Sequence, residues 1–258
     1  MSEPTFLVCG GQRCGTTAVW HLLNDHPDVF LAQPVSPEPK FFLSDENGTI
    51  ADYEQQYFSD TQRASAVGEK STSYFEMPGT AERIAAAYPD IRLVFILRHP
   101  AERAVSNFLF SVAGGFETRT FDEAMKGAND PAFERKRVRL VSPFDYIKRG
   151  RYAERLKPFH QYFSANHLLY LFFDDLVAAP ESLCRSLYNF LGVDADFHPP
   201  SLGTVANSGA AWPKLMSQQT LTELIKAFAD SNESLSRLTG RDLECWTRPT
   251  ERLLECLN

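Results

Sequence analysis

The chain has 258 residues, of which 43% are hydrophobic and 23% charged, a composition typical of a folded globular protein. Its formal net charge of −7 argues against general nucleic-acid binding, because proteins of that class carry a basic footprint. Five cysteines without metal-ligand spacing favour a reduced chain that holds no metal, and no apolar run approaches the roughly 20 residues of a membrane helix. We therefore expect a cytoplasmic protein with no integral membrane segment, folded as a single domain over residues 1–258.

Strands and helices alternate along the first hundred residues of the predicted structure. Each predicted strand is a short apolar run, which is typical of a parallel strand buried on both faces. The clearest helix start is Pro100, because proline is favoured in the first turn of a helix. The strands are expected at 5–9, 67–70 and 91–97, and the helices at 16–24, 53–58, 81–88 and from residue 100 onward.

The second half continues this alternation after a charge-rich stretch of less regular pattern at 112–142. A helix at 152–163, a strand at 168–173 and a helix at 180–191 are expected in turn, with Gly192 as the C-cap of that last helix. Helices are also predicted to fill 218–238 and to cover the C-terminus. Because strands that alternate with helices form parallel sheets, we predict an α/β fold with a P-loop-like central parallel β-sheet flanked by helices on both faces.

The first strand runs into a turn with the outline of a phosphate-binding loop. Gly10 and Gly15 have the spacing of the loop that binds nucleoside triphosphates, but Thr16 stands where that loop has its lysine, followed by Thr17. The nearest cation is Arg13, inside the turn. Backbone N–H groups at a helix N-terminus hold an anion without that lysine. The loop therefore predicts a phosphate-bearing donor that is not simply ATP.

Five segments in this order carry a family resemblance, at residues 11–17, 38–42, 69–75, 97–106 and 150–192. Together they resemble the PAPS-dependent sulfotransferases, and most closely the carbohydrate branch represented by heparan sulfate sulfotransferases and their bacterial relatives. The resemblance implies a donor, 3′-phosphoadenosine 5′-phosphosulfate (PAPS), with one 5′-phosphosulfate and one 3′-phosphate. It also implies in-line transfer of a sulfuryl group to a hydroxyl or amine of a small-molecule or saccharide acceptor.

The resemblance implies catalytic roles for three residues. Glu38 matches the general base, and prolines on both sides restrict its backbone. Arg13 would bind the phosphosulfate bridge and offset the charge that grows on the leaving phosphate oxygen. Lys70 would stabilise the charge-rich transition state near the sulfate. The alternatives are a solvated Glu38, a surface Arg13 and an ion pair between Lys70 and Glu69.

The donor-binding residues implied by the resemblance belong to two parts of the chain. The loop and the start of the following helix would hold the 5′-phosphate, whereas the segment after the strand at 91–97 would hold the 3′-phosphate. Alternatives for these residues are helix N-capping by the threonines and a core aromatic role for the tyrosine. The expected set is Arg13, Cys14, Gly15, Thr16, Thr17, Arg98, Ser106 and Tyr152.

Other basic residues have two interpretations each. Lys40 either contacts the acceptor or the sulfuryl oxygens, or is a solvated lysine. Arg103 either serves the 3′-phosphate or lies on the surface. The basic run Arg135-Lys136-Arg137 with Arg139 either docks an anionic acceptor or forms a solvated helix face.

Two segments of the relatives that act on heparan sulfate have no match in this chain. These are a Gly-Phe-Tyr/Trp-Cys segment and a Lys-Gly-Arg donor loop near the C-terminus. Asn207-Ser208-Gly209 and Lys214 occupy the general region of that loop without matching it. A glycosaminoglycan acceptor is therefore not implied.

Two other functions compete with sulfuryl transfer. A P-loop kinase of a small metabolite explains the strand, loop and helix, but neither the missing lysine nor the missing carboxylate pattern for magnesium. A non-catalytic nucleotide-binding protein would keep Arg13 and Arg98 but has no need of Glu38 and Lys70 together.

Overall fold

The computed structural model describes residues 2–61, 64–128, 143–202 and 212–258. The chain forms two compact units, the first comprising Met1–Leu97 and Lys157–Gly209, the second Arg98–Leu156 and Ala210–Asn258. The first unit contains the central sheet and the loop after the first strand, and the second is helical. That residues 1–258 form a single domain stays a prediction.

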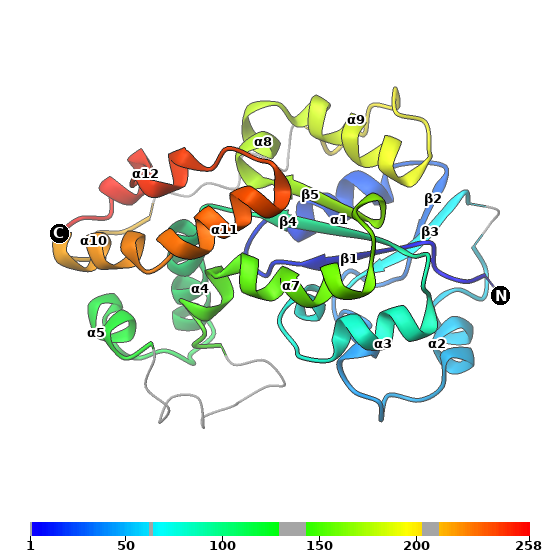
Figure 1. Ribbon diagram of the computed structural model, residues 1–258, viewed down its shortest axis with the longest axis horizontal. Coiled ribbons are helices and arrows are strands. Elements are labelled where there is room, and N and C mark those ends of the chain that lie inside the picture. Colours follow the sequence, from blue (N-terminus) through cyan, green and yellow to red (C-terminus); the bar gives the residue numbers. More distant parts are fainter. Residues whose placement is uncertain (1, 62–63, 129–142, 203–211) are drawn as a thin grey trace. The chain divides into compact units, whose positions relative to one another are not determined.

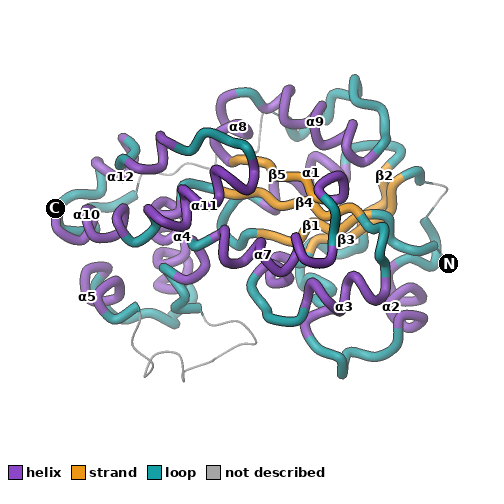
Figure 2. Tube along the Cα trace, viewed as in Figure 1, coloured by secondary structure: helices purple, strands orange, loops and turns teal. Residues whose placement is uncertain are grey.

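The first unit is built on a five-stranded sheet, drawn in orange in Figure 2. Every strand pairing in it is parallel. Its strand order, β2-β3-β1-β4-β5, places β1 at the centre. The predicted parallel sheet is confirmed. The strands are β1 (Phe6–Gly10), β2 (Val29–Leu31), β3 (Ala66–Lys70), β4 (Arg92–Leu97) and β5 (Leu168–Phe172).

Helices cover both faces of this sheet, as expected for an α/β fold. Figure 1 shows α1, α8 and α9 on one face and α2 and α3 on the other. Their bounds are α1 (Thr16–Asn24), α2 (Ile50–Tyr57), α3 (Thr80–Ala87), α8 (Phe173–Ala178) and α9 (Pro180–Leu191).

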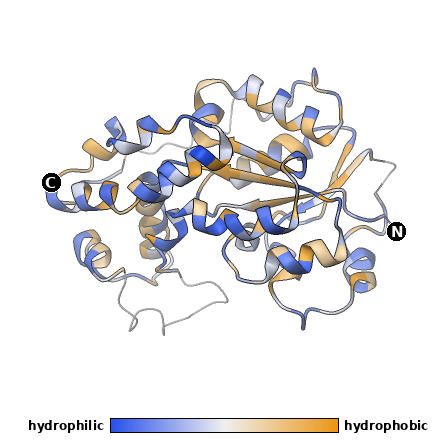
Figure 3. Ribbon diagram, in the orientation of Figure 1, coloured by the Kyte–Doolittle hydropathy of each residue, from blue (hydrophilic) through white to orange (hydrophobic). Residues whose placement is uncertain are grey.

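Most strand residues are apolar and enclosed, although β3 ends in the charged residues Glu69 and Lys70. Every residue of β1 and β3 is buried, and the strands stand out as hydrophobic in Figure 3. Phe95 on β4 lies against Phe75, Phe159 and Tyr170, with ring centroids 5.0–5.9 Å apart. Such burial is the main driving force for the sheet to form.

The second unit packs its helices around an apolar core of its own. Phe108, Phe121, Tyr146, Leu224 and Phe228 are all buried in that core. The helix α7 (Tyr152–Tyr162) begins in this unit and ends in the first. The other helices among the described residues of this unit are α4 (Pro100–Ala113), α5 (Phe121–Lys126), α10 (Gln218–Lys226), α11 (Ala229–Thr239) and α12 (Glu251–Leu254).

The observed elements agree with the predicted ones except in a few places. The helices α5 and α8 and the three-residue strand β2 were not predicted, because such short segments show no clear hydrophobic period. The proline-rich segment that carries Glu38 ends in a 3₁₀ turn, η1 (Phe41–Leu43), and another such turn, η2 (Thr72–Phe75), follows β3. Among the described residues, no helix is long and apolar enough to cross a membrane.

Candidate active site

The phosphate-binding-type loop connects β1 to α1 in the first unit. The strand ends at Gly10 and the helix begins at Thr16. The amide of Gly11 donates to the carbonyl oxygen of Ile96 on β4 at 2.8 Å, and the amide of Cys14 donates to Gly11 at 3.1 Å. These bonds hold the loop against the carboxyl end of β4.

Two glycines are required for the shape of this loop. Gly15 has φ 102°, and a Cβ at that position would lie 2.9 Å from a ring carbon of Phe173. Gly10 has φ 146°, and its Cβ would lie 2.7 Å from the Cβ of Phe75. Residues with a Cβ disfavour such φ values, and at these two positions the Cβ would also clash with its neighbours. The exposed Arg13 adopts a left-handed backbone with φ 68°, so the loop contains a strained non-glycine residue as well.

The N-terminus of α1 is left without a side-chain cap. Its N-cap is Gly15, and Thr16 and Thr17 are the first two helical residues. The alternative that the threonines cap this helix is therefore wrong, because glycine occupies the capping position. The first N–H groups of a helix have no intrahelical acceptor and lie at the positive end of its dipole. This end of α1 is suited to an anion.

Glu38 lies at the centre of a cluster of donors. Its Oε1 is 2.6 Å from Nζ of Lys70, and the hydroxyl of Thr72 donates to both carboxylate oxygens at 3.1 and 3.2 Å. The amide of Thr72 donates to Oε2 at 3.3 Å, and Nζ of Lys40 lies 3.8 Å from the same oxygen. The side chains of Glu38 and Lys70 are 12% and 6% exposed. The carboxylate is thus fixed in place yet still reaches solvent.

The ion pair of Lys70 differs from the alternative drawn from the sequence. Lys70 pairs with Glu38 and not with its neighbour Glu69. Adjacent residues of a strand point to opposite faces of the sheet, so the carboxylate of Glu69 is directed away from the lysine. Glu69 instead accepts hydrogen bonds from Tyr53, Tyr74 and Ser71.

The Glu38 cluster and the loop lie at the same edge of the sheet. Val8 of β1 is in register with Lys70 of β3, and the amide of Ser71 donates to the Val8 carbonyl at 3.0 Å. The carbonyl oxygen of Thr72 lies 2.9 Å from where a Cβ on Gly10 would be. The carboxyl ends of parallel strands are where open α/β sheets bind ligands. Within this unit, the structure therefore brings the loop, Glu38 and Lys70 together.

In the second unit, Arg98 makes an ion pair with Glu102. Nη2 and Nε of Arg98 lie 2.5 and 2.9 Å from Oε2 of Glu102, while the Thr250 hydroxyl donates to Oε1 at 2.7 Å. Burial alone would raise the pKa of Glu102, but Arg98 and Thr250 outweigh it and lower that pKa. Ser106 lies one turn further along α4 and is also buried. Arg98, Glu102 and Ser106 thus follow one face of the helix start.

Tyr152 and Arg103 are both buried in the second unit. The hydroxyl of Tyr152 donates to the Arg98 carbonyl at 2.8 Å, and its ring packs edge-on against Trp246. This geometry agrees with the core aromatic alternative and also fixes the backbone of Arg98. Arg103 is 1% exposed and donates to the carbonyl of Tyr146. The alternative of a surface arginine is therefore wrong.

Two residues beside Arg98 were missed by the sequence analysis. The guanidinium of Arg252 lies 3.9 Å from the ring centre of Trp212, and that of Arg98 lies 5.5 Å from the same ring. Burial and the charge of Arg98 lower the pKa of Arg252. No motif marks either residue in the sequence, since both are more than 110 positions from Arg98. The basic run 135–139 and Asn207–Gly209 lie outside the described residues.

Comparisons with known proteins match the chain to one family. A family model described as "Sulfotransferase family" matches residues 36–198. Mouse heparan sulfate glucosamine 3-O-sulfotransferase 3B1 is 26% identical over 93% of this chain and 64% of its own length. The chain thus spans less than two thirds of that relative.

Solved structures show the same fold. A sulfotransferase from Alicyclobacillus acidocaldarius is 28% identical, with a TM-score of 0.81 over 96% of this chain and all of the other. A mouse sulfotransferase complexed with PAP is 17% identical, with a TM-score of 0.50 over 95% of this chain and 86% of the other, and supports the fold alone. The sheet, the loop and these matches lead to one conclusion: the chain belongs to the sulfotransferase family.

Proposed function

We propose that this chain transfers a sulfuryl group from PAPS to a hydroxyl or amine of a small-molecule or saccharide acceptor. The observation that carries the proposal is the contact of Glu38 with Lys70, 2.6 Å between Oε1 and Nζ. This contact brings a carboxylate and an ammonium group to the sheet edge where the loop between β1 and α1 also lies, which supports a base and a cation at that point. Saccharide acceptors are supported by the mouse relative, whose name specifies heparan sulfate glucosamine.

The residues of the first unit fit a single 5′-phosphosulfate. The N–H groups at the start of α1 and the Arg13 side chain would bind the phosphate, together with Cys14, Gly15, Thr16 and Thr17. The glycine backbone allows the close approach that a Cβ would prevent. Thr16 in place of a lysine leaves no group for a terminal phosphate, which favours PAPS over ATP.

The residues of the second unit fit the 3′-phosphate of the donor. Arg98 and Ser106 would supply a guanidinium and a hydroxyl to that phosphate, and Tyr152 holds the Arg98 backbone in place. Glu102 keeps the guanidinium oriented through two hydrogen bonds. PAPS supplies the sulfuryl group and the leaving phosphate.

Glu38 acts as the general base in the proposed reaction. Its carboxylate takes the proton of the acceptor hydroxyl as the acceptor oxygen forms its bond to sulfur. The bond between sulfur and the bridging oxygen breaks in the same step, and its electron pair stays on the 5′-phosphate of the departing bisphosphate. Lys70 and Arg13 stabilise the negative charge that develops on the sulfuryl and bridging oxygens.

The proposal includes a cytoplasmic site of action, where reducing conditions suit an odd number of cysteines. A P-loop kinase is not favoured, because the family model and the structural relatives are sulfotransferases.

One experiment tests the proposed function directly. The protein is incubated with PAPS carrying labelled sulfate and a panel of phenols, sugars, lipids and metabolites, and labelled products are separated. In parallel, binding of adenosine 3′,5′-bisphosphate is measured in EDTA. We expect label transfer to one acceptor class and metal-independent bisphosphate binding. ATP binding that needs magnesium, without bisphosphate binding, would support the kinase instead.

A further inference from the structure

Glu69 is a fully buried carboxylate that the proposed reaction does not use directly. It lies on β3 next to Lys70, with 0% of its surface exposed. Burying a carboxylate is costly unless hydrogen bonds stabilise its charged form. Three hydroxyls do so: those of Ser71 and Tyr74 donate at 2.6 Å each, and that of Tyr53 donates at 3.1 Å. Three hydroxyl donors around one buried carboxylate are more than the packing of β3 requires.

Two of these hydroxyls connect Glu69 to the segment that carries Glu38. The amide of Lys40 donates to Oγ of Ser71 at 2.8 Å, and the amide of Phe42 donates to the hydroxyl of Tyr74 at 3.3 Å. A hydroxyl has one proton, so a hydroxyl that donates to Glu69 presents its lone pairs to the amide. The ionised carboxylate of Glu69 therefore orients both acceptors.

The conformation of this segment requires such support. Lys40 has φ 56°, a left-handed backbone that is uncommon for a residue with a Cβ and persists only where its surroundings hold it. It precedes the turn η1 and lies two residues after Glu38. A shift of the Lys40 backbone would therefore move the Glu38 carboxylate away from Lys70 and Thr72.

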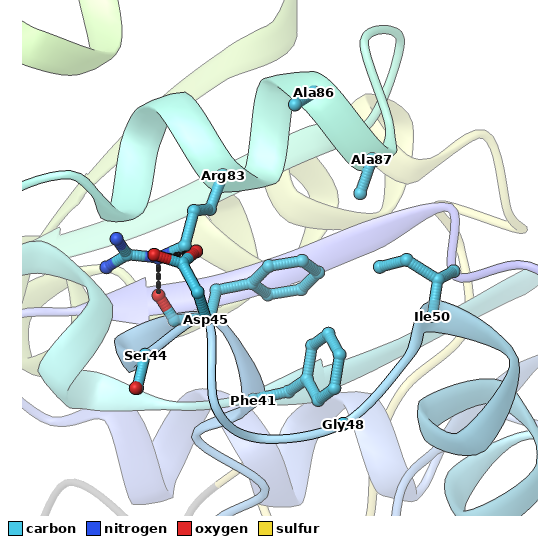
Figure 4. A pocket seen from close by; sticks show the side chains of 9 residues that line it. Phe41, Ser44, Asp45, Gly48, Ile50, Arg83, Ala86 and Ala87 are labelled. Carbon is cyan, nitrogen blue, oxygen red and sulfur yellow. Dashed lines mark hydrogen bonds and ion pairs between the residues drawn. The ribbon is translucent and has the colours of Figure 1, made fainter.

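A second anchor holds the far side of η1. Nε of Arg83, on α3, donates to the carbonyl of Phe42 at 2.8 Å, and its Nη2 donates to that of Leu43 at 3.1 Å. Arg83 also lines a cavity of about 310 Å³ beside the turn, together with Ala86 of the same helix, and its guanidinium lies next to Asp45 (Figure 4). Phe42 is itself buried against Tyr53, Tyr74 and Tyr88, so side-chain packing and these backbone hydrogen bonds together hold the turn.

We propose that Glu69 is a positioning residue for sulfuryl transfer. Through Ser71 and Tyr74 it holds the backbone of residues 38–43 and so places the carboxylate of Glu38. This inference rests on the proposed role of Glu38 as general base.

The electrostatic surroundings of Glu69 support the same role. The pKa of Glu69 is raised to about 7. Burial is the largest cause, and it outweighs the opposite effect of the three hydroxyl donors. The groups that face it are Glu38, Cys9 on β1, Tyr53 and Tyr57 on α2, and Tyr74 on η2. Burial raises the pKa of Cys9 and of the three tyrosines, so these remain neutral near pH 7. Ionisation of Glu69 would then complete the network as the pH rises through neutrality.

Three variants test the inference: Glu69→Gln, Tyr74→Phe and Ser71→Ala. We measure kcat, KM for PAPS, bisphosphate affinity, and hydrogen exchange of the Lys40 and Phe42 amides by NMR. We expect each variant to lower kcat about 10- to 100-fold, with KM and bisphosphate affinity within about twofold of wild type. We also expect Glu69→Gln to speed exchange at both amides and to remove an ionisation near pH 7 from the kcat profile.

Tyr188→Phe is the matched control. Tyr188, on α9, is buried in the same unit and donates its hydroxyl to the carbonyl of Leu22 on α1 at 2.8 Å, on the face of the sheet opposite α2 and α3 (Figure 1). We expect Tyr188→Phe to lower the free energy of unfolding about as much as Tyr74→Phe does, while its kcat stays at the wild-type value. Tyr74→Phe removes a single oxygen and leaves Glu69 in place, so it keeps the inference testable if Glu69→Gln folds poorly.

The outcomes separate this inference from the proposed function. If Glu38→Gln is inactive while Glu69→Gln and Tyr74→Phe keep wild-type kcat and amide exchange, the positioning role is wrong and the general base stands. If Glu38→Gln keeps wild-type turnover, the proposed function itself fails.

Discussion

The ammonium group of Lys70 lies 2.6 Å from Oε1 of Glu38, and both side chains are largely buried. The two residues are 32 positions apart in the chain and come from a loop and from the end of β3. A pair enclosed in this way interacts more strongly than a surface ion pair and holds both groups in one geometry. The proposed base Glu38 and the proposed stabilising cation Lys70 therefore hold each other in place. We expect a substitution of either residue to displace the other.

Replacing Glu38 with glutamine should remove the base without removing donor binding. The amide is nearly isosteric but cannot take the acceptor proton, so we expect kcat to fall about 10²- to 10⁴-fold. Bisphosphate affinity, measured by calorimetry, should stay within about threefold. Glu46→Gln, an exposed glutamate of the same segment, is the control and should be fully active. Normal turnover in Glu38→Gln would exclude this residue as the base.

Replacing Arg98 with alanine should weaken PAPS binding through the 3′-phosphate alone. We expect a loss of at least about tenfold for PAPS, and little loss for adenosine 5′-phosphosulfate, which lacks that phosphate. Arg237→Ala, at an exposed ion pair on α11, should change neither affinity. Because Arg98→Ala leaves Glu102 buried without its cation, Ser106→Ala serves as a milder second variant. Equal losses for both ligands would contradict the assignment.

Replacing Gly15 with alanine should distort the loop and the start of α1. The new Cβ would lie 2.9 Å from the Phe173 ring, and the backbone has φ 102°. We expect a loss of at least about 2 kcal/mol in unfolding free energy, together with weaker bisphosphate binding. Gly240→Ala, with φ 70° and open space around its Cβ, should cost only about 1 kcal/mol. Similar values for the two variants, from urea unfolding, would show that the contact with Phe173 is unimportant.

The buried Glu69 should make stability fall as pH rises toward neutrality. Burial raises its pKa from an ordinary 4.5 to about 7, so the folded protein keeps a proton that the unfolded chain has released. The stability contributed by protonated Glu69 is therefore fully present below about pH 4.5. It declines as the pH rises and is lost above about pH 7. The linked change is about 3 kcal/mol.

Urea unfolding of wild type and Glu69→Gln between pH 4.5 and 8 measures this change. As the pH rises over this range, the wild-type protein should lose about 3 kcal/mol of unfolding free energy relative to Glu69→Gln. A difference that does not vary with pH would show that Glu69 keeps its ordinary pKa.

Chelators should leave the rate of sulfuryl transfer unchanged, since the proposed charge stabilisation comes from Lys70 and Arg13. The measurement is the initial rate of label transfer with and without EDTA, with magnesium added back as the control. Inhibition by EDTA that magnesium reverses would contradict the mechanism.

The sequence by itself determined the longer helices, most of the strands and the loop between β1 and α1. The helix at 16–24 and the apolar strands follow from local patterns, because residue spacing and turn chemistry act over a few positions. The family resemblance, with Glu38, Lys70 and Arg98 as its site residues, could also be drawn from motif order, and the family is confirmed.

Only the tertiary structure decided which groups meet. In the sequence, Lys70 adjoins Glu69, yet the alternation of side chains along β3 sends Lys70 to Glu38 and Glu69 to Tyr53 and Tyr74. The stacking of Arg252 on Trp212 likewise has no signature in the chain. Such contacts depend on how β1, β3 and the helices pack, which no local pattern encodes.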